Sequence, residues 1–329
     1  MTAILGESAP VLTLVQRVAR LAPTPLPILI TGETGTGKEV VARAIHEASG
    51  RRGPFVAVDC GALTATLVES ELFGHERGAF TGANTRKEGL VFAARAGTFF
   101  LDEIGELPLE AQTRLLRLLE GGRYRPVGAT EERPADIRVV AATWRNLSEA
   151  VETGRFRRDL FHRLAVAEIP LPPLRARGGD VRILFDRFLE TAAKEGRRAT
   201  PSIDASFDTF LHRWSWPGNI RELKNLAMYL AALAGPRIRR DDLPPMYRDA
   251  TTGPVAETGG PAVRTDLPYL EARRAWLDTF QLRYVEAQIL AHGGNISAAA
   301  RAAGMDRRSI QRVLARLGGS LPGEGGQPG

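Results

Sequence analysis

Two short stretches of the chain carry residue types that suit phosphate chemistry. The first, residues 32–39, reads Gly-Glu-Thr-Gly-Thr-Gly-Lys-Glu. Glycines let the main chain wrap a phosphate closely, and Lys38 adds a positive charge. The second is Asp102-Glu103, which ends an apolar run. An aspartate in this place can hold Mg²⁺, and the adjacent glutamate can orient or deprotonate an attacking water.

The first stretch has the phosphate-loop pattern with one departure, because Glu39 stands where a Ser or Thr usually binds magnesium. An apolar run precedes the loop and helical spacing follows it. This order argues against the alternative of a glycine-rich turn without function. The alternative for Asp102-Glu103 is an acidic pair at a helix start. The nucleotide-binding candidates are Gly32, Glu33, Thr34, Gly35, Thr36, Gly37, Lys38 and Glu39.

The elements that must position these residues alternate between strand and helix. Apolar runs predict strands at residues 26–31, 54–60, 98–101, 137–142 and 166–169. Helices are predicted at residues 10–21, after residue 38, and at 63–73, 88–94 and 109–119. Strands that alternate with helices and end in polar residues indicate a parallel sheet with helices on both faces.

The rest of the chain predicts helices. Residues 181–193, 203–214 and 219–233 have helical periodicity and no strand signal, which indicates a small helical domain. A Thr/Gly/Pro-rich stretch then predicts a linker, and residues 267–317 are helical again.

Composition narrows the class of protein. The chain has 329 residues, which suggests two or three domains, and 43% of them are hydrophobic, as in ordinary globular proteins. Cys60 is the single cysteine, and the five histidines are scattered, so neither an internal disulfide nor a zinc site is expected. No bilayer-length apolar run or signal peptide is evident, so a cytoplasmic protein is expected. A net charge of +6 permits nucleic-acid contact.

Four motifs resemble those of the AAA+ ATPases of bacterial sigma-54-dependent transcription activators, also called enhancer-binding proteins. Residues 32–39 resemble their Walker A motif, including the unusual Glu39, and residues 96–104 resemble their Walker B motif. Residues 71–83 contain their diagnostic Gly-Ala-Phe-Thr-Gly-Ala loop, and residues 216–223 resemble their sensor II segment. The resemblance covers nearly the whole chain.

The resemblance implies an α/β AAA+ core, a helical lid and a C-terminal Fis-type helix-turn-helix. It also implies ATP and Mg²⁺ as cofactors, and a bacterial cytoplasmic protein without a membrane partner. The expected partners are sigma-54 RNA polymerase holoenzyme, upstream double-stranded DNA and further copies of the chain, from a dimer to a hexameric ring. The expected domains are residues 1–172 (ATPase core), 173–249 (lid), 250–266 (linker), 267–319 (DNA binding) and 320–329 (disordered tail).

The glycine-flanked aromatic in the diagnostic loop predicts a contact with a partner. Phe80 and Thr81 lie between Gly78 and Gly82 with no apolar neighbours to bury them. A surface turn whose Phe80 folds back on the body is the alternative. The resemblance assigns contact with sigma-54 to Gly78, Ala79, Phe80, Thr81, Gly82 and Ala83.

Three arginines are candidates for contact with phosphate. Arg157 and Arg163 lie six positions apart on a predicted helix and so point in different directions. The resemblance makes them arginine fingers that reach a neighbour's ATP and stabilise the transferring phosphoryl group. Solvated arginines paired with Asp159 or Glu152 are the alternative. The resemblance makes Arg221 a phosphate ligand from the lid, with a salt bridge to a carboxylate as its alternative.

Two positions depart from the family's pattern. Asp59 stands where the family usually has an Asn that holds the Walker B glutamate, and two carboxylates in one site should raise one pKa. Trp144 stands where the sensor I strand usually ends in Asn or His, and an indole cannot replace that amide. Thr143 is the neighbour able to take part of that role. Slow hydrolysis is therefore expected.

Residues 284–317 predict a helix-turn-helix. Asn295 and Asp306 can cap its second and third helices, and Gly304 supplies the turn between them. The apolar face of the last helix leaves a basic face suited to phosphates and guanines. That face comprises Arg307, Arg308, Gln311, Arg312 and Arg316. A solvated basic helix in a three-helix bundle is the alternative. Fis-type domains normally pair, which predicts an inverted-repeat DNA site.

Three functions compete. The leading one is an ATP-driven activator that remodels the sigma-54 polymerase closed complex. The second is a DNA-binding regulator whose ATPase is impaired by Trp144 and Asp59 and whose ring serves as a nucleotide-gated scaffold. The third, another AAA+ machine, is disfavoured by the Phe80-Thr81 loop. Because the ATPase begins at residues 4–8, control is expected from a separate protein, unless the chain is part of a longer one.

Overall fold

The computed structural model describes residues 4–63, 67–248, 269–292 and 295–317. The chain divides into two compact units, Met1–Arg248 and Asp249–Gly329, which are described separately. Among the described residues, no helix is both long and apolar enough to cross a membrane.

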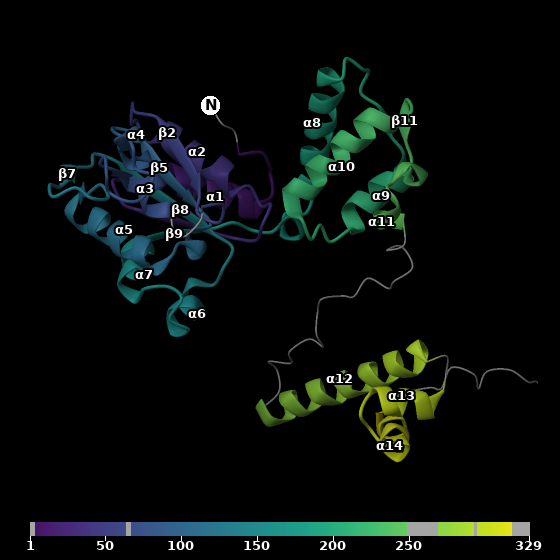
Figure 1. The fold of residues 1–329 in the computed structure, drawn as a ribbon. Helices are drawn as coiled ribbons and strands as arrows, with labels where there is room; N and C mark the ends of the chain where they lie inside the picture. The colour runs from purple at the N-terminus through teal and green to yellow at the C-terminus, as the bar shows by residue number, and fades with distance from the viewer. Residues whose placement is uncertain (1–3, 64–66, 249–268, 293–294, 318–329) are drawn as a thin grey trace, which may run out of the picture. The chain divides into compact units, whose positions relative to one another are not determined.

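The first unit is built on five parallel strands, as the sequence predicted (Figure 1). Their order across the sheet is β2-β5-β8-β1-β9, and all four pairings are parallel. The strands are β1 (Ile28–Thr31), β2 (Phe55–Asp59), β5 (Thr98–Asp102), β8 (Arg138–Thr143) and β9 (Ala167–Pro170). The carboxyl ends of all five strands therefore meet at one edge.

Alternating side chains divide the sheet between two cores. Ile28 and Ile30 pack on one face with α1 (Ala9–Leu21) and α2 (Lys38–Ala48). Leu29, between them, packs on the other face. The helices of that second face are α3 (Val68–Phe73), α4 (Leu90–Ala93), α5 (Leu109–Gly121), α6 (Leu147–Glu152) and α7 (Arg158–Leu164). Burial on both faces is the expected state of a parallel sheet.

Two short hairpins differ from the sequence prediction. β3 (Gly74–His75) pairs with β4 (Lys87–Glu88), so the predicted helix at 88–94 is wrong for its first residues. β6 (Arg123–Tyr124) pairs with β7 (Arg133–Pro134). The helix predicted at 63–73 begins at Val68, and residues 64–66 lie outside the described part. Two-residue strands are too short to give a periodic signal.

The lid follows the sheet and contains the three predicted helices. They are α8 (Asp180–Glu195), α9 (Ala205–Arg213) and α10 (Asn219–Leu233), with a short α11 (Pro245–Arg248) after them. Their core includes the fully buried Phe185, Phe207 and Trp216. The expectation of no strand is wrong, because β10 (Ser202–Ile203) and β11 (Arg237–Ile238) form a small parallel pair.

A buried carboxylate joins the lid to the start of the chain. Asp180, the first residue of α8, is 1% exposed. Its Oδ1 accepts from the backbone N–H groups of Glu7 (2.7 Å) and Ser8 (2.9 Å), and its Oδ2 accepts from the Ser8 hydroxyl (2.6 Å). The segment before α1 is thereby fixed to the lid.

The second unit consists of α12 (Tyr269–Ala291), α13 (Ile296–Ala302) and α14 (Arg307–Leu317). Its core includes Val285, Ile289, Ala299, Ala300, Ile310 and Leu314. The two caps predicted from the sequence are confirmed, since Asn295 Oδ1 accepts the N–H of Ala298 (3.1 Å) and Asp306 Oδ1 that of Ser309 (2.8 Å). The predicted linker, residues 250–266, and tail, 320–329, lie outside the described residues.

Candidate functional site

The phosphate-loop residues connect β1 to the first turn of α2. Gly35 (φ 80°) and Gly37 (φ 95°) have left-handed backbone conformations that side chains disfavour, which explains the glycines. Lys38 begins α2, and its side chain is 6% exposed. Its Nζ donates to the carbonyl of Gly32 (3.2 Å) and lies at 3.5 Å from that of Glu33. The loop thus joins a lysine to a helix N-terminus, a site suited to anions.

The acidic pair lies beside this lysine. Asp102 ends β5, and Glu103 follows with a left-handed backbone (φ 51°). Glu103 Oε1 is 3.6 Å from Lys38 Nζ, and the Glu103 side chain is 21% exposed. Burial raises the pKa of both carboxyls, while the Lys38 ammonium opposes that rise. Glu103 Oε2 is buried without a hydrogen-bond partner among the described residues, which suits an acceptor for water.

Magnesium fits the acidic residues only if nucleotide phosphates supply part of its coordination shell, rather than as an ion held by protein side chains alone. Among the described residues, no group of three or more His, Cys, Asp or Glu side chains is placed to hold a metal. Mg²⁺ needs only one or two carboxylates when substrate phosphates and water complete its shell. Asp102 is half-buried, faces Asp59 in the strand register and has a pKa raised further by the charge of Asp59. Asp102 is therefore the candidate ligand.

The sensor I position presents an exposed aromatic. Trp144 follows β8 and is 53% exposed. The Arg145 guanidinium lies 5.4 Å from the indole centroid and pairs with Glu106 at 2.5 Å. The Thr143 hydroxyl is fully buried and accepts the backbone N–H of Arg145 (3.0 Å). Thr143 thus shapes the turn that presents the indole.

The two candidate arginine fingers occupy different elements. Arg157 precedes α7 in an extended conformation, so the prediction that one helix carries both is wrong; Arg163 alone lies within α7. Arg157 Nη2 pairs with Asp159 at 2.6 Å, the pairing that the sequence left as an alternative. Arg163 donates to the carbonyl of Leu119 from Nε (3.3 Å) and Nη2 (3.1 Å). Both guanidinium groups lie on the surface along α5 and α7.

The lid brings Arg221 to the phosphate loop. Its backbone N–H donates to the carbonyl of Gly35 (3.2 Å), although 186 residues separate the two in sequence. The Arg221 side chain is exposed and makes no ion pair within the described part of the chain. The alternative predicted for Arg221, a salt bridge to a neighbouring carboxylate, is therefore not formed among those residues.

The Phe80-Thr81 loop leaves its aromatic partly exposed and partly packed against the body of the domain, as the alternative prediction had it. Phe80 is 40% exposed and packs edge-on against His75, with ring centroids 5.0 Å apart. Gly78 (φ 80°) and Gly82 (φ 103°) have left-handed conformations, and the Gly78 N–H donates to the carbonyl of Ala83 (2.8 Å). The glycines thus close a tight turn that holds Phe80 and an exposed Thr81 at its tip.

A second loop, residues 122–135, supports the first and was missed from the sequence. The Val127 N–H donates to the carbonyl of Gly74 (2.8 Å), and the Val127 carbonyl accepts the N–H of Glu76 (3.0 Å). Arg133 Nη2 pairs with Glu76 Oε1 at 2.6 Å. A glycine pair at 121–122 was the available signal, but loop pairing over 50 residues leaves no local pattern.

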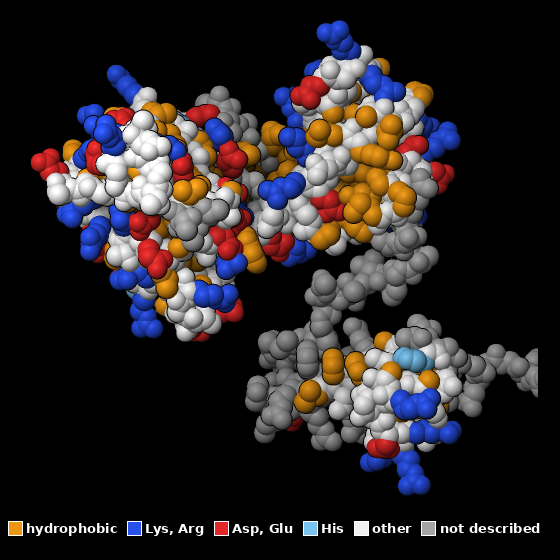
Figure 2. Space-filling view, in the orientation of Figure 1, with side chains coloured by type: hydrophobic (Ala, Val, Ile, Leu, Met, Phe, Trp, Pro, Cys, Tyr) orange, Lys and Arg blue, Asp and Glu red, His pale blue; other side chains and the backbone are white. Residues whose placement is uncertain are grey.

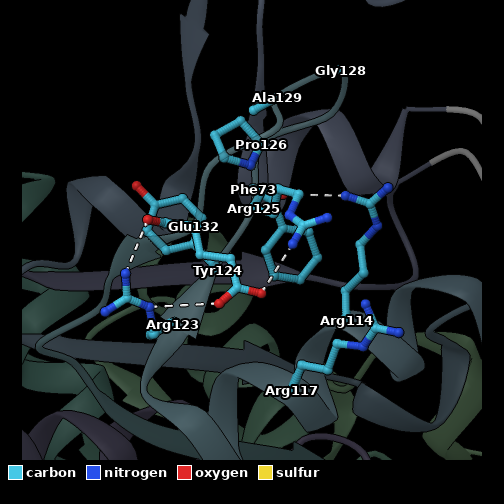
Figure 3. A pocket seen from close by; sticks show the side chains of 10 residues that line it. All are labelled: Phe73, Arg114, Arg117, Arg123, Tyr124, Arg125, Pro126, Gly128, Ala129 and Glu132. Atoms are coloured by element: carbon cyan, nitrogen blue, oxygen red, sulfur yellow. Dashed lines mark hydrogen bonds and ion pairs between the residues drawn. The ribbon is translucent and has the colours of Figure 1, made fainter.

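An arginine-lined pocket of about 200 Å³ lies at the root of this second loop (Figure 3). Glu132 lies between Arg123 (3.5 Å) and Arg125 (3.3 Å), and Arg114 pairs with Glu69 (3.0 Å) outside the pocket. Arg117 also lines it. None of its lining residues belongs to the phosphate loop or the acidic pair, so this pocket is separate from the candidate nucleotide site.

The candidate DNA-binding residues gather on one helix. Arg307, Arg308, Gln311 and Arg312 are exposed on α14, while Ile310 and Leu314 of the same helix are buried. Arg316 also belongs to α14, but its side chain lies outside those described. Figure 2 shows Lys and Arg side chains gathered over the α13–α14 part of this unit.

Comparisons with known proteins identify close relatives. Residues 4–170 match the sigma-54 interaction domain, and residues 175–259 match the AAA+ ATPase lid domain. The chain is 41% identical to the nitric oxide reductase transcription regulator NorR1 of Cupriavidus necator, over 96% of this chain and 63% of that protein. It is also 41% identical to the regulatory protein AtoC of Escherichia coli, over 96% of this chain and 68% of that protein. The chain thus spans less than two thirds of the first relative's length.

A solved structure is similar over almost the whole chain. The crystal structure of NtrX from Brucella abortus in complex with ADP aligns with a TM-score of 0.69 and 36% identity, covering 97% of this chain and 69% of that chain.

The close approach between the phosphate loop and the lid predicts a selective effect of Gly35→Ala. A Cβ on Gly35 would lie 2.3 Å from the carbonyl oxygen of Gly218, in addition to the strain at φ +80°. Gly50→Ala is the matched control, because Gly50 has φ +72° and no atom within 4 Å of the added Cβ. In both variants, backbone strain should lower the free energy of unfolding by about 1–2 kcal/mol.

Gly35→Ala alone should also displace the lid segment, seen as faster amide hydrogen exchange at residues 216–223. Equal exchange there in the two variants would contradict the predicted clash.

Proposed function

This chain belongs to the sigma-54 interaction domain family, and on that premise we propose that it is an ATP-driven activator of sigma-54-dependent transcription. It binds upstream DNA, assembles into a ring and uses ATP hydrolysis to remodel the closed complex of sigma-54 RNA polymerase. The match to the family over residues 4–170 and to the AAA+ lid over residues 175–259 supports the proposal.

The observation that carries the ATPase is the approach of Lys38 to Glu103, at 3.6 Å. Lys38 binds the terminal phosphates of ATP, and the loop N–H groups bind the rest of the phosphate chain. Asp102 would hold Mg²⁺, which would supply positive charge against those phosphates. Glu103 accepts a proton from the attacking water, and its raised pKa makes it a stronger base than an exposed glutamate.

The remaining candidate residues serve the coupling of hydrolysis to transcription. Arg157 and Arg163 reach the ATP of a neighbouring copy and stabilise the transferring phosphoryl group, while Arg221 binds phosphate from the lid. Phe80 and Thr81, exposed at a glycine-closed turn, contact sigma-54. The basic face of α14 binds DNA.

A second candidate function is a DNA-binding regulator whose ring is a nucleotide-gated scaffold with an impaired ATPase. The 53% exposed indole of Trp144 at the sensor I position favours it, because an indole has no acceptor with which to position water. The charge of Asp59 beside Asp102 also favours it.

Phosphate release separates these two functions. Glu103→Gln should lower the ATP turnover number about 10²- to 10⁴-fold while ATP still binds, because the general base is lost. Lys38→Ala defines the background, and Glu110→Gln, on the exposed start of α5, is the control and should be unchanged. A wild-type rate equal to that of Lys38→Ala would favour the scaffold.

Phe80→Ala should leave ATP turnover unchanged and abolish sigma-54-dependent open-complex formation. Phe92→Ala is the matched control, because Phe92 is 39% exposed against 40% for Phe80 and lies outside the loop on α4. Promoter melting measured with permanganate reports the outcome. Normal melting by Phe80→Ala would remove the proposed role of the loop.

Arg308→Ala should weaken binding to the upstream site by about 1–3 kcal/mol if it reads a guanine, and should reduce the salt dependence of binding if it neutralises a phosphate. Arg187→Ala removes the same charge from the lid surface and is the control. Binding is measured by fluorescence anisotropy on DNA selected by the intact protein, at several salt concentrations. Identical affinity and salt slope for the two variants would contradict a DNA-binding face on α14.

A further inference from the structure

Glu33, although part of the phosphate loop, directs its carboxylate at residues outside that loop. Both guanidinium NH₂ groups of Arg175 donate hydrogen bonds to this carboxylate, Nη1 to Oε2 (2.8 Å) and Nη2 to Oε1. Asn219 Nδ2 donates to the same Oε2 (3.1 Å). Arg175 lies in the connection between β9 and α8, on the 3-10 helix Leu174–Ala176, and Asn219 begins lid helix α10. Three distant segments therefore meet on one carboxylate.

We propose that Glu33, Arg175 and Asn219 form a latch that holds the lid in register over the phosphate loop, so that Glu33 acts as a positioning residue rather than as a nucleotide ligand. The inference rests on the proposed ATPase for its kinetic consequence. Its structural consequence, the position of the lid, does not depend on hydrolysis.

Asn219 is the centre of the latch. It is fully buried and has a left-handed backbone (φ 53°), which a non-glycine residue adopts at a cost when surrounding contacts impose it. Its Nδ2 also donates to the carbonyl of Thr34 (3.0 Å), and its Oδ1 accepts the N–H of Leu174 (2.8 Å). The side-chain amide thus ties the phosphate loop to both the connection and the lid.

Main-chain contacts extend the latch along the loop. The Gly35 carbonyl accepts the N–H of Arg221 (3.2 Å), and the Thr36 carbonyl accepts Nη2 of the buried Arg177 (3.1 Å). Consecutive loop residues are therefore bonded from the lid side. Because Arg221 is next but one to Asn219, any shift of Asn219 also moves the Arg221 guanidinium relative to the phosphates.

The geometry of the Glu33–Arg175 ion pair makes it more stabilising than the exposure of its two side chains suggests. The side chains of Arg175 and Glu33 are 48% and 44% exposed, and exposed ion pairs stabilise proteins little. A bidentate guanidinium–carboxylate pair with a buried amide as third partner is the exception, because its geometry is fixed in advance. The hydrogen bonds from Arg175 and Asn219 lower the pKa of Glu33 to about 2, so the carboxylate stays charged at every pH of assay.

The latch acts on nucleotide binding more than on chemistry. Lys38 contacts the main-chain carbonyls of Gly32 and Glu33 and the carboxylate of Glu103, and none of these is a side-chain bond of the latch. We therefore expect Lys38 and Glu103 to keep their positions when the latch opens, so that turnover at saturating ATP is retained. A loosened lid carries Arg221 away from the phosphates, so affinity for ATP falls.

The test is a double-mutant cycle on the full chain with Glu33→Gln, Arg175→Gln and both together. Each variant should raise the KM for ATP about tenfold or more, the size expected for loss of a charge-assisted hydrogen bond, with kcat changed less than twofold. The double variant should be no worse than either single variant, because one interaction is lost in all three. Arg175→Lys, which keeps the charge but not the fork, should fall between wild type and Arg175→Gln.

Asp186→Asn is the matched control. It breaks another arginine–carboxylate contact, in which Arg182 Nε donates to both carboxylate oxygens of Asp186. The Arg182 side chain is 39% exposed and that of Asp186 is 49% exposed, but both residues lie on lid helix α8. The control should change neither KM nor kcat.

Amide hydrogen exchange of nucleotide-free protein separates failure of the latch from failure of the ATPase. Residues 218–223 should exchange faster in the Glu33 and Arg175 variants than in wild type or Asp186→Asn. Faster exchange without any ATPase would support the latch and contradict the proposed enzyme. Unchanged exchange, or additive effects of the two substitutions on KM, would overturn the latch.

Discussion

The structure depends on the placement of one ammonium and one carboxylate at the edge of a parallel sheet. Lys38 follows β1 and Glu103 follows β5, with β8 between these two strands. Their side chains converge across the end of β8 at 3.6 Å, largely shielded from water. Removing either partner alone would leave a partly buried charge without its counterion, which is costly. The same arrangement puts the proposed base, Glu103, beside the lysine proposed to bind phosphate, so one contact would serve both stability and chemistry.

The lid is joined to this site by polar contacts rather than by a continuous apolar core. Its own core around Phe207 and Trp216 is a separate cluster from the two cores that cover the sheet. Hydrogen bonds to the loop main chain and the Asp180 contact with Ser8 cross the boundary instead. Polar contacts fix direction and register but are readily exchanged for water or ligand, so such a boundary can shift without disturbing any of these three cores.

Sequence reasoning succeeded where a local pattern carries the structural information. The helix over residues 219–233 was predicted to the residue, because its apolar face repeats at helical spacing. The approach of the phosphate loop to Asp102-Glu103 followed from the rule that parallel strands share one carboxyl edge. The loop at 122–135 and the Glu33–Arg175 pair were missed, because both depend on contacts between residues 50 or more positions apart. Arg157 was placed on a helix because a run of arginines has no feature that marks where the first turn begins.

Trp144 shows how a departure from the family's pattern is accommodated by its neighbours. Exposing about half of an indole to water is unfavourable, and the stacked guanidinium of Arg145, held by Glu106, offsets part of that cost. The buried hydroxyl of Thr143 fixes the turn that makes this stacking possible. Among the described residues, the position directly after β8 is held by Trp144 rather than by a side-chain amide, and Glu103 Oε2 has no hydrogen-bond partner there, so Glu103 is the acceptor that we propose for an attacking water. If Glu103 is the general base as proposed, the rate of hydrolysis depends on how well the surrounding burial keeps its carboxylate basic.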